Sequence, residues 1–403
     1  MINGQESKFV FLLSLPRSGS TLLSAILNNH SNILSPPEMW FLLSLSEFPY
    51  YRGDTCYNSK VANEAFREQV GSELFYQASE KFATHIYNSL LINNGKNIFV
   101  DKTPRYYYAL ETIDQLFPSS KKIWLLRNPL AIVASYKSTW KCEILPIIKG
   151  EREHLYYTFD FTLGFWRYCS YFGQEHPLLC KIHYENLVSD PCNESIRICD
   201  FLNVQYEEDM FKYRSNPQHV SILKYAAVGD KNLLHYDRPH DKSITLWKTI
   251  LTKDEIRAVC SMLGEKVFCE MGYGDEFEEA ERITKQKFND EPDDSIIVNS
   301  VKNLKNIYGK TLDLNYKFDQ SNQLVVEMKN EKFLNNYVRE DIQTDPKSTL
   351  QDEEYQRYYI NFLENVIQSK ENQILHLERK FEKITKYIPF KHTMKTVINK
   401  ILD

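Results

Sequence analysis

The feature that most limits how this chain can fold is a strand, loop and helix signature near its start. Residues 9–15 form an apolar run of strand length, and the short polar loop PRSGST at residues 16–21 follows it. Apolar side chains at helical spacing then predict a helix over residues 20–28. In such a unit the backbone N–H groups of the loop and the positive end of the helix dipole point at one spot. The sequence therefore predicts a phosphate or sulfate site here.

The composition of this loop strengthens the expectation of an anion site. Gly19 permits close approach of the backbone, Arg17 supplies a guanidinium, and Ser18, Ser20 and Thr21 supply hydroxyl donors. The G-x-x-x-x-G-K-[ST] frame of ATP-binding P-loops is missing, because no lysine precedes the hydroxyl residues. The alternative is an ordinary turn rich in small residues.

Short apolar runs alternate with longer amphipathic ones from residue 9 to residue 273, which is typical of a parallel sheet covered by helices. The fold class is therefore α/β. Expected strands are residues 9–15, 97–100, 122–126 and 179–183. Expected helices are residues 20–28, 106–117, 130–140, 156–175, 193–202 and 253–263. Thr252 and Glu255 form a candidate capping box for the last helix.

Composition divides the chain into three parts: an α/β domain over residues 1–275, a charged linker or extension over 276–350, and a helical segment over 351–403. Apolar residues in the third part keep a three-four spacing: Ile360, Leu363, Ile367, Ile374, Leu377, Phe381, Ile384 and Ile388, interrupted by Lys370. This spacing suits a coiled coil that joins copies of the chain, or an amphipathic helix that folds back on the core.

Charge and cysteine content exclude several classes of protein. The formal net charge of −5 gives no general attraction to nucleic acid or to anionic membranes. The eight cysteines show no C-x-x-C pair and no metal-type spacing, so we expect reduced thiols, a cytoplasmic protein and no metal site. No apolar run is long enough to cross a bilayer, and residues 9–15 lack a signal-peptide cleavage site.

A second candidate anion site follows the expected strand at residues 122–126. Arg127 stands at the end of this strand, and Asn128 and Pro129 lead into the expected helix at 130–140. Ligands of open α/β sheets bind at that edge. Ser135 lies on the helix eight residues after Arg127. The alternative is an exposed arginine and a serine that packs against another helix.

Together, residues 16–23, the Arg127-Asn128-Pro129 segment and Ser135 resemble the 5′-phosphosulfate loop and the 3′-phosphate site of sulfotransferases that use 3′-phosphoadenosine 5′-phosphosulfate (PAPS). The resemblance is strongest to the protein-tyrosine sulfotransferase and bacterial branch, and it covers about residues 9–273. It implies a P-loop-like sheet and sulfuryl transfer from PAPS to a hydroxyl or amine. It also implies that Arg17–Thr21 hold the 5′-phosphosulfate, that Arg127 and Ser135 bind the 3′-phosphate, and that Tyr184 lies near the nucleotide.

The resemblance further implies two catalytic groups. Glu38, 21 residues after Arg17, is the expected base, although a solvated loop carboxylate is the alternative. Lys102, in a K-x-P segment, is expected to neutralise the bridging oxygen without a metal; its alternative is a pair with Asp101. His30 is a rival base, but it ends a helix and is interpreted as structural.

A late loop, around residues 228–247, is expected to close over the nucleotide. Its candidate groups remain open: Lys231, Arg238 or Lys242 as the cation and Ser221 or Ser243 as the hydroxyl. The acceptor, small or carrier-bound, is equally open between a sugar, a phenol and a lipid head. Two other functions compete with sulfuryl transfer: a nucleotide-dependent kinase, and a scaffold that acts through a C-terminal coiled coil.

Overall fold

The computed structural model describes most of the chain up to residue 317. The described residues are 8–50, 57–150, 155–173, 176–212, 241, 243–308, 310, 312–314 and 316–317. Ser221, Lys231, Arg238, Lys242 and the segment 351–403 lie outside them, so the expectations for these residues stay predictions.

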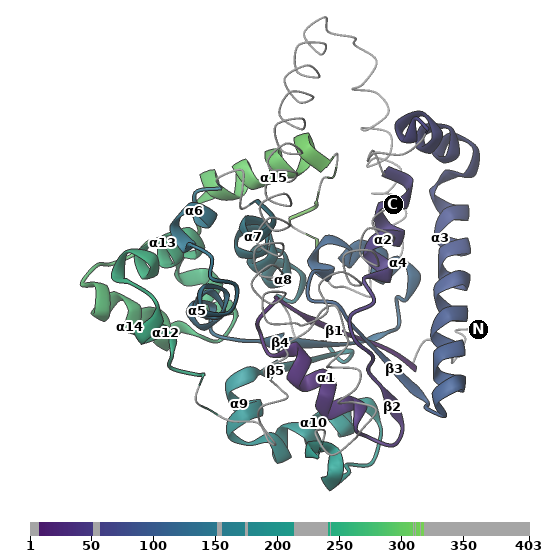
Figure 1. Ribbon diagram of the computed structural model, residues 1–403, viewed down its shortest axis with the longest axis horizontal. Coiled ribbons are helices and arrows are strands. Elements are labelled where there is room, and N and C mark those ends of the chain that lie inside the picture. The colour runs from purple at the N-terminus through teal and green to yellow at the C-terminus, as the bar shows by residue number, and fades with distance from the viewer. Residues whose placement is uncertain are drawn as a thin grey trace, which may run out of the picture. The chain divides into compact units, whose positions relative to one another are not determined.

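Five parallel strands form the central sheet, in the order β2-β3-β1-β4-β5 (Figure 1). Their bounds are β1 Phe9–Ser14, β2 Ile33–Leu34, β3 Ile98–Lys102, β4 Lys121–Leu126 and β5 Leu179–His183. Every residue of β1 is buried, as expected for a strand covered on both faces. The predicted α/β class with a P-loop-like parallel sheet is confirmed.

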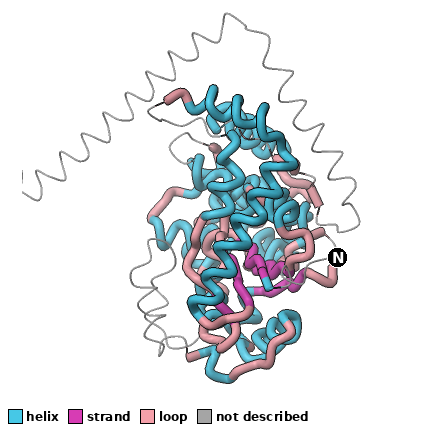
Figure 2. The backbone as a smooth tube through the Cα atoms, turned by 90° about the vertical axis from the view of Figure 1, so that its right-hand side faces the viewer, coloured by secondary structure: helices cyan, strands magenta, loops and turns pink. Residues whose placement is uncertain are grey.

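Helices cover both faces of the sheet, and Figure 2 shows the strands as one group among them. The bounds are α1 Ser20–Asn28, α2 Phe41–Glu47, α3 Ser59–Asn94, α4 Leu110–Leu116, α5 Pro129–Trp140, α6 Ile144–Ile148, α7 Leu155–Phe159, α8 Phe165–Tyr171, α9 Tyr184–Ser189, α10 Pro191–Leu202, α12 Trp247–Ile250, α13 Lys253–Glu270, α14 Gly274–Thr284 and α15 Asp294–Tyr308. Shorter turns are η2 Phe48–Tyr50, η3 Tyr106–Tyr108, the π-helical η5 Asp160–Gly164, and η6 Glu208–Phe211.

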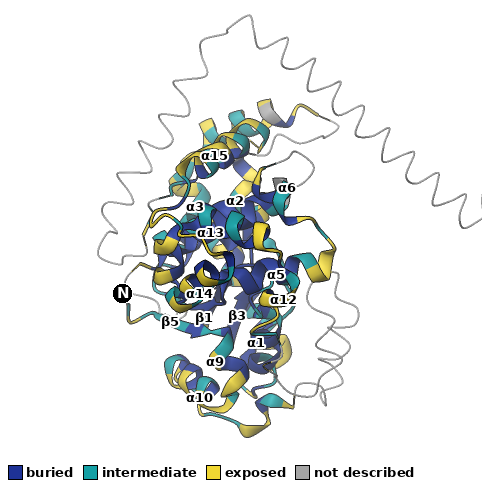
Figure 3. Ribbon diagram, turned by 90° about the vertical axis from the view of Figure 1, so that its left-hand side faces the viewer, coloured by how far each residue is buried: buried dark blue, intermediate teal, exposed yellow. Residues whose placement is uncertain are grey.

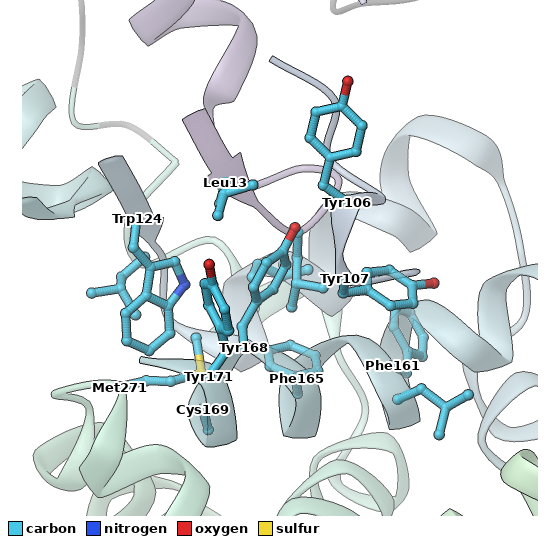
Figure 4. Packing of buried hydrophobic residues seen from close by; sticks show 14 of the residues in the cluster. Leu13, Tyr106, Tyr107, Trp124, Phe161, Phe165, Tyr168, Cys169, Tyr171 and Met271 are labelled. Carbon is cyan, nitrogen blue, oxygen red and sulfur yellow. The ribbon is translucent and has the colours of Figure 1, made fainter. Parts of the chain in front are cut away.

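Alternating side chains of β1 feed two hydrophobic cores. Phe11 and Leu13 join the larger core with α4, α5, α8 and α13, whereas Val10 and Leu12 join the smaller core with α1, α9 and α10. Figure 3 shows the resulting pattern, with a buried sheet and exposed outer faces on α10 and α14. In the larger core, Tyr107, Phe165 and Tyr168 gather beside the strand residues Leu13 and Trp124 (Figure 4).

Several elements differ from the expectation. The helix expected at 106–117 is divided into η3 and α4, and the one expected at 156–175 is interrupted by η5. The long helix α3 has no counterpart among the expected helices; it bends at Gly71, where φ is 70°. The capping box of Thr252 and Glu255 is present as predicted.

The short strand β2 was not among the expected strands; it lies at the edge of the sheet and does not pair with β1. Ile33 and Leu34 pair with β3, because both edges of β1 are already taken by β3 and β4.

Packing continues past residue 275, where composition suggested a boundary. Phe277 and Ala280 of α14 and Ile297 and Leu304 of α15 belong to the larger hydrophobic core. The first compact unit accordingly runs to Gln320. Among the described helices, none combines the length and apolar character that crossing a bilayer requires.

Candidate active site

The loop after β1 is built to leave backbone N–H groups free of capping side chains. A turn closes it through the Ser18 amide, which donates to the Leu15 carbonyl at 3.2 Å. Arg17 and Gly19 both have positive φ, 69° and 94°. No side chain caps the N-terminus of α1, so its first amides can face an anion.

Gly19 is required by its surroundings as well as by its backbone. A Cβ atom built on it would lie 2.3 Å from Cδ2 of Tyr184, the first residue of α9. The Tyr184 hydroxyl is 2.7 Å from Oγ of Ser243. The sequence left the hydroxyl of the late loop open between Ser221 and Ser243, and the structure places Ser243 beside the Tyr184 and Arg127 side chains.

Arg127, at the end of β4, is only 6% exposed. Its Nη1 donates to the Arg17 carbonyl at 2.6 Å, Nη2 donates to the Ser243 carbonyl at 3.4 Å, and the guanidinium lies 4.3 Å from the ring centroid of Tyr184. Its Nε is buried without a hydrogen-bond partner. Burial lowers the pKa of Arg127, but arginine stays protonated at neutral pH. A buried cation with a donor that lacks a protein partner is suited to bind an anion.

The Arg17 side chain joins the two anion motifs. Its Nε donates to Oγ of Ser135 at 3.1 Å and its Nη2 donates to Oγ1 of Thr139 at 3.1 Å, both on α5. The guanidinium also lies 5.7 Å from the ring centroid of Trp140. Arg17 was expected at the phosphosulfate and Ser135 at the 3′-phosphate, so the two expected sites adjoin. Thr139 carried no signal in the sequence.

Of the other loop hydroxyls, Ser18 and Ser20 are buried and Thr21 is half-buried. They stand where the turn meets α1, among the uncapped amides. The structure therefore brings the whole expected loop, Tyr184, Arg127 and Ser135 to the carboxyl edge of β1, β4 and β5.

Glu38 and Lys102 meet at the end of β3, which flanks β1 on the side opposite β4. Lys102 Nζ donates to Glu38 Oε1 at 2.7 Å, and their side chains are 2% and 9% exposed, respectively. Trp40 Nε1 donates to Glu38 Oε2 at 3.1 Å. The solvated alternative for Glu38 and the Asp101 alternative for Lys102 were therefore wrong, because the two residues pair with each other.

Asp101 has partners of its own. It accepts hydrogen bonds from the hydroxyls of Tyr87 and Tyr106, the latter at 2.7 Å. Burial raises the pKa of Asp101 to about 6, even though both tyrosines favour the charged form. His30 is also structural: its Nδ1 accepts from the Asn32 amide at 2.9 Å, and its Nε2 lies 2.8 Å from the Gln205 carbonyl.

A buried ion pair behind Trp40 was not predicted. Arg105 holds Asp160 through Nε at 3.0 Å and Nη2 at 2.6 Å. Asp160 also accepts from the hydroxyls of Tyr107 and Tyr136, each at 2.9 Å. Against the effect of burial, the Asp160 carboxylate raises the pKa of Arg105. No local pattern signals this cluster, since its members come from three separate segments.

Within the described ranges, no group of three or more His, Cys, Asp or Glu side chains is arranged to hold a metal ion. The cysteines of those ranges are free thiols: Cys142, Cys169, Cys180, Cys192, Cys199, Cys260 and Cys269.

The amino-acid sequence is similar to the sequences of several known proteins. Residues 10–208 match the profile of a family described as the sulfotransferase family. The nodulation protein NoeE of Sinorhizobium fredii is 31% identical over 278 residues, which are 65% of this chain and 65% of NoeE. A putative protein-tyrosine sulfotransferase of Caenorhabditis briggsae is 25% identical over 255 residues, 62% of this chain and 84% of that protein.

Among solved structures, a sulfotransferase domain from the curacin biosynthetic pathway is 24% identical and has a TM-score of 0.43. The alignment covers 62% of this chain and 95% of that domain. The matched region of the chain thus spans about two thirds of NoeE and nearly all of this smaller domain.

Proposed function

Residues 10–208 belong to the sulfotransferase family, and from this premise we propose that the protein moves a sulfuryl group from PAPS to a hydroxyl or amine of an acceptor. One observation carries the proposal. An uncapped helix N-terminus follows β1, a buried arginine with an unpaired Nε ends β4 on one side, and the Glu38–Lys102 pair stands on the other.

The choice of PAPS as donor rests on two adjoining anion sites. A nucleotide with phosphates at both its 3′ and 5′ positions needs two such sites. Arg127 and Ser135 supply guanidinium and hydroxyl donors for the 3′-phosphate, and Arg17 and the loop amides, with Ser18, Ser20 and Thr21, supply donors for the phosphosulfate. Tyr184 and Ser243 border the same place. The absence of a P-loop lysine in this loop speaks against a kinase.

The proposed chemistry is a direct in-line transfer. Glu38 takes the proton from the acceptor hydroxyl as the acceptor oxygen bonds to sulfur, and the bond from sulfur to the bridging oxygen breaks. The electron pair of that bond leaves on the phosphate of 3′,5′-ADP, where Lys102 and the loop amides stabilise the developing charge. Glu38 then releases its proton to solvent. The site needs no metal for these steps.

A thermal unfolding experiment tests the donor. We expect 3′,5′-ADP, without metal, to raise the melting temperature, because a ligand at 100 times its Kd stabilises by about 2.7 kcal/mol. ATP with Mg²⁺ should have little effect. Stabilisation by ATP with Mg²⁺ and none by 3′,5′-ADP would favour a kinase and overturn the proposal. A screen of sugars, phenols, lipids and carrier-bound compounds with sulfur-labelled PAPS then identifies the acceptor.

A further inference from the structure

The two oxygens of the Glu38 carboxylate are held by donors of different kinds. Oε1 accepts from the Lys102 ammonium at 2.7 Å and Oε2 accepts from the Trp40 indole at 3.1 Å. Lys102 comes from the end of β3, whereas Trp40 lies two residues after Glu38 on the same loop. The orientation of the carboxylate is therefore set by a lysine ammonium on one oxygen and an indole N–H on the other.

The backbone at Trp40 is unusual in a way that serves this contact. Trp40 has φ 56° and ψ 11°, a left-handed conformation that bulky residues rarely adopt, and it precedes the first residue of α2. Its side chain does not cap the helix. Strained backbone of this kind persists where the surroundings hold it in place. Here it turns the indole back toward the carboxylate two residues earlier.

The Trp40 ring is supported from behind by a fixed cation. The Arg105 guanidinium lies 5.5 Å from the ring centroid. Arg105 is itself immobilised by two hydrogen bonds to Asp160, and Asp160 is held by Tyr107 and Tyr136. The indole is therefore held by a cation–π contact to the buried Arg105 guanidinium, which is itself ion-paired with Asp160.

We propose that Trp40 is a positioning residue: it keeps Oε2 of Glu38 occupied and thereby makes Oε1 the atom that takes the acceptor proton. The inference rests on the proposed function, in which Lys102 turns to the bridging oxygen and so releases Oε1. The Trp40 N–H stays on Oε2 throughout. The proton then passes from the acceptor oxygen to Oε1, and the electron pair of the broken O–H bond forms the new bond to sulfur.

Indole resonances in a nitrogen-15 NMR spectrum test the contact directly. The chain has five tryptophans, and Trp40→Phe identifies the resonance of Trp40 by its loss. Glu38→Gln should move that resonance upfield, since a neutral amide accepts a weaker hydrogen bond than a carboxylate. The half-buried Trp166, whose ring faces Lys266, is the matched control, and its resonance should stay in place. A Trp40 resonance that does not move with Glu38→Gln would overturn the proposal.

Kinetics separate positioning from a merely structural role. With an acceptor from the labelled-PAPS screen, Trp40→Phe should lower kcat about ten-fold or more and leave KM for PAPS unchanged, because an aromatic side chain remains but the indole N–H that holds Oε2 is lost. Trp166→Phe should match the wild type. An unchanged kcat in Trp40→Phe contradicts the proposal, whereas failure of the wild-type protein to bind 3′,5′-ADP refutes the proposed function instead.

Discussion

Glu38 and Lys102 reach each other because the segments that carry them follow neighbouring strands. β2 pairs with β3, and Glu38 comes four residues after β2 while Lys102 ends β3. Each charge is almost buried and is compensated by the other. Without nucleotide, the base and the cation thus hold each other, and the bridging oxygen of the donor must compete for Lys102.

Glu38→Gln tests the role of the base. The variant keeps the size of the side chain but cannot accept the acceptor proton, so turnover should fall by about 10² to 10⁴-fold. Calorimetry should show that 3′,5′-ADP still binds, because Arg17, Arg127 and the loop amides that hold its phosphates are unchanged. Glu265→Gln, at an exposed position on α13, is the control. Wild-type turnover in Glu38→Gln would remove this residue from the mechanism.

Gly19→Ala tests the close approach of the loop to α9. The new Cβ would meet the Tyr184 ring at a position with φ 94°. We expect a loss of about 1 to 3 kcal/mol in unfolding free energy, measured by denaturant titration, and weaker binding of 3′,5′-ADP. Gly95→Ala also has positive φ, 61°, but nothing lies within 4 Å of its Cβ. If both variants lose the same stability, the ring contact contributes nothing.

At the scale of elements, a hydrogen bond to the buried Asp101 carboxyl group links α3 to β3. Tyr87 of α3 and Tyr106 of η3 both donate to Oδ2 of Asp101. Because burial raises the pKa of Asp101 to about 6 from 3.8, the folded protein binds its proton more tightly than the unfolded chain does. The stability that this proton contributes is complete below pH 3.8 and is lost as pH rises through about 6.

Asp101→Asn should therefore gain stability relative to the wild type as pH rises. The amide oxygen can accept from both tyrosines and carries no charge to desolvate. Between pH 4 and pH 7, the difference in unfolding free energy between the two proteins should change by on the order of 3 kcal/mol in favour of the variant. Denaturant titrations at several pH values measure it, with the exposed Asp254→Asn as control. A pH-independent difference would contradict the assignment.

Elements whose ends depend on local sequence were predictable. Strands β1, β3, β4 and β5 stand out as short apolar runs, β5 has the predicted bounds, and the capping box of α13 is a local signal. The break at η5 was not predictable, because it depends on distant contacts. There Gly164 lets the helix approach Leu15 so closely that a Cβ would lie 2.5 Å from its side chain, and Asp160 meets Arg105.

The residues of the candidate site also fall into those that the sequence could predict and those that it could not. Arg17 and Arg127 follow strands and Lys102 ends one, so the edge of the sheet where they gather could be predicted from their order in the sequence alone. Thr139, Trp40 and the Arg105–Asp160 pair could not, since each acts through a partner far away in sequence or through an unusual backbone angle. The hydrogen bond from Arg17 to Ser135 also depends on side-chain direction, which sequence spacing does not encode.

At the scale of the whole molecule, the first compact unit ends at Gln320 and includes α14 and α15. The apolar spacing at 360–388 lies beyond it. We expect removal of residues 350–403 to lower the oligomeric state, as measured by sedimentation equilibrium, and to leave 3′,5′-ADP binding intact. An unchanged oligomeric state would rule out a coiled coil between copies.

The central claim is that two adjoining anion sites together recognise a nucleotide with phosphates at both its 3′ and 5′ positions. Metal-free calorimetry with 3′,5′-ADP and with 5′-AMP, which lacks the 3′-phosphate, tests it most directly. We predict at least ten-fold tighter binding of 3′,5′-ADP, and a loss of about 1.5 to 3 kcal/mol of that preference in Arg127→Ala. Equal affinity for the two nucleotides, or a preference that survives in Arg127→Ala, would contradict the account.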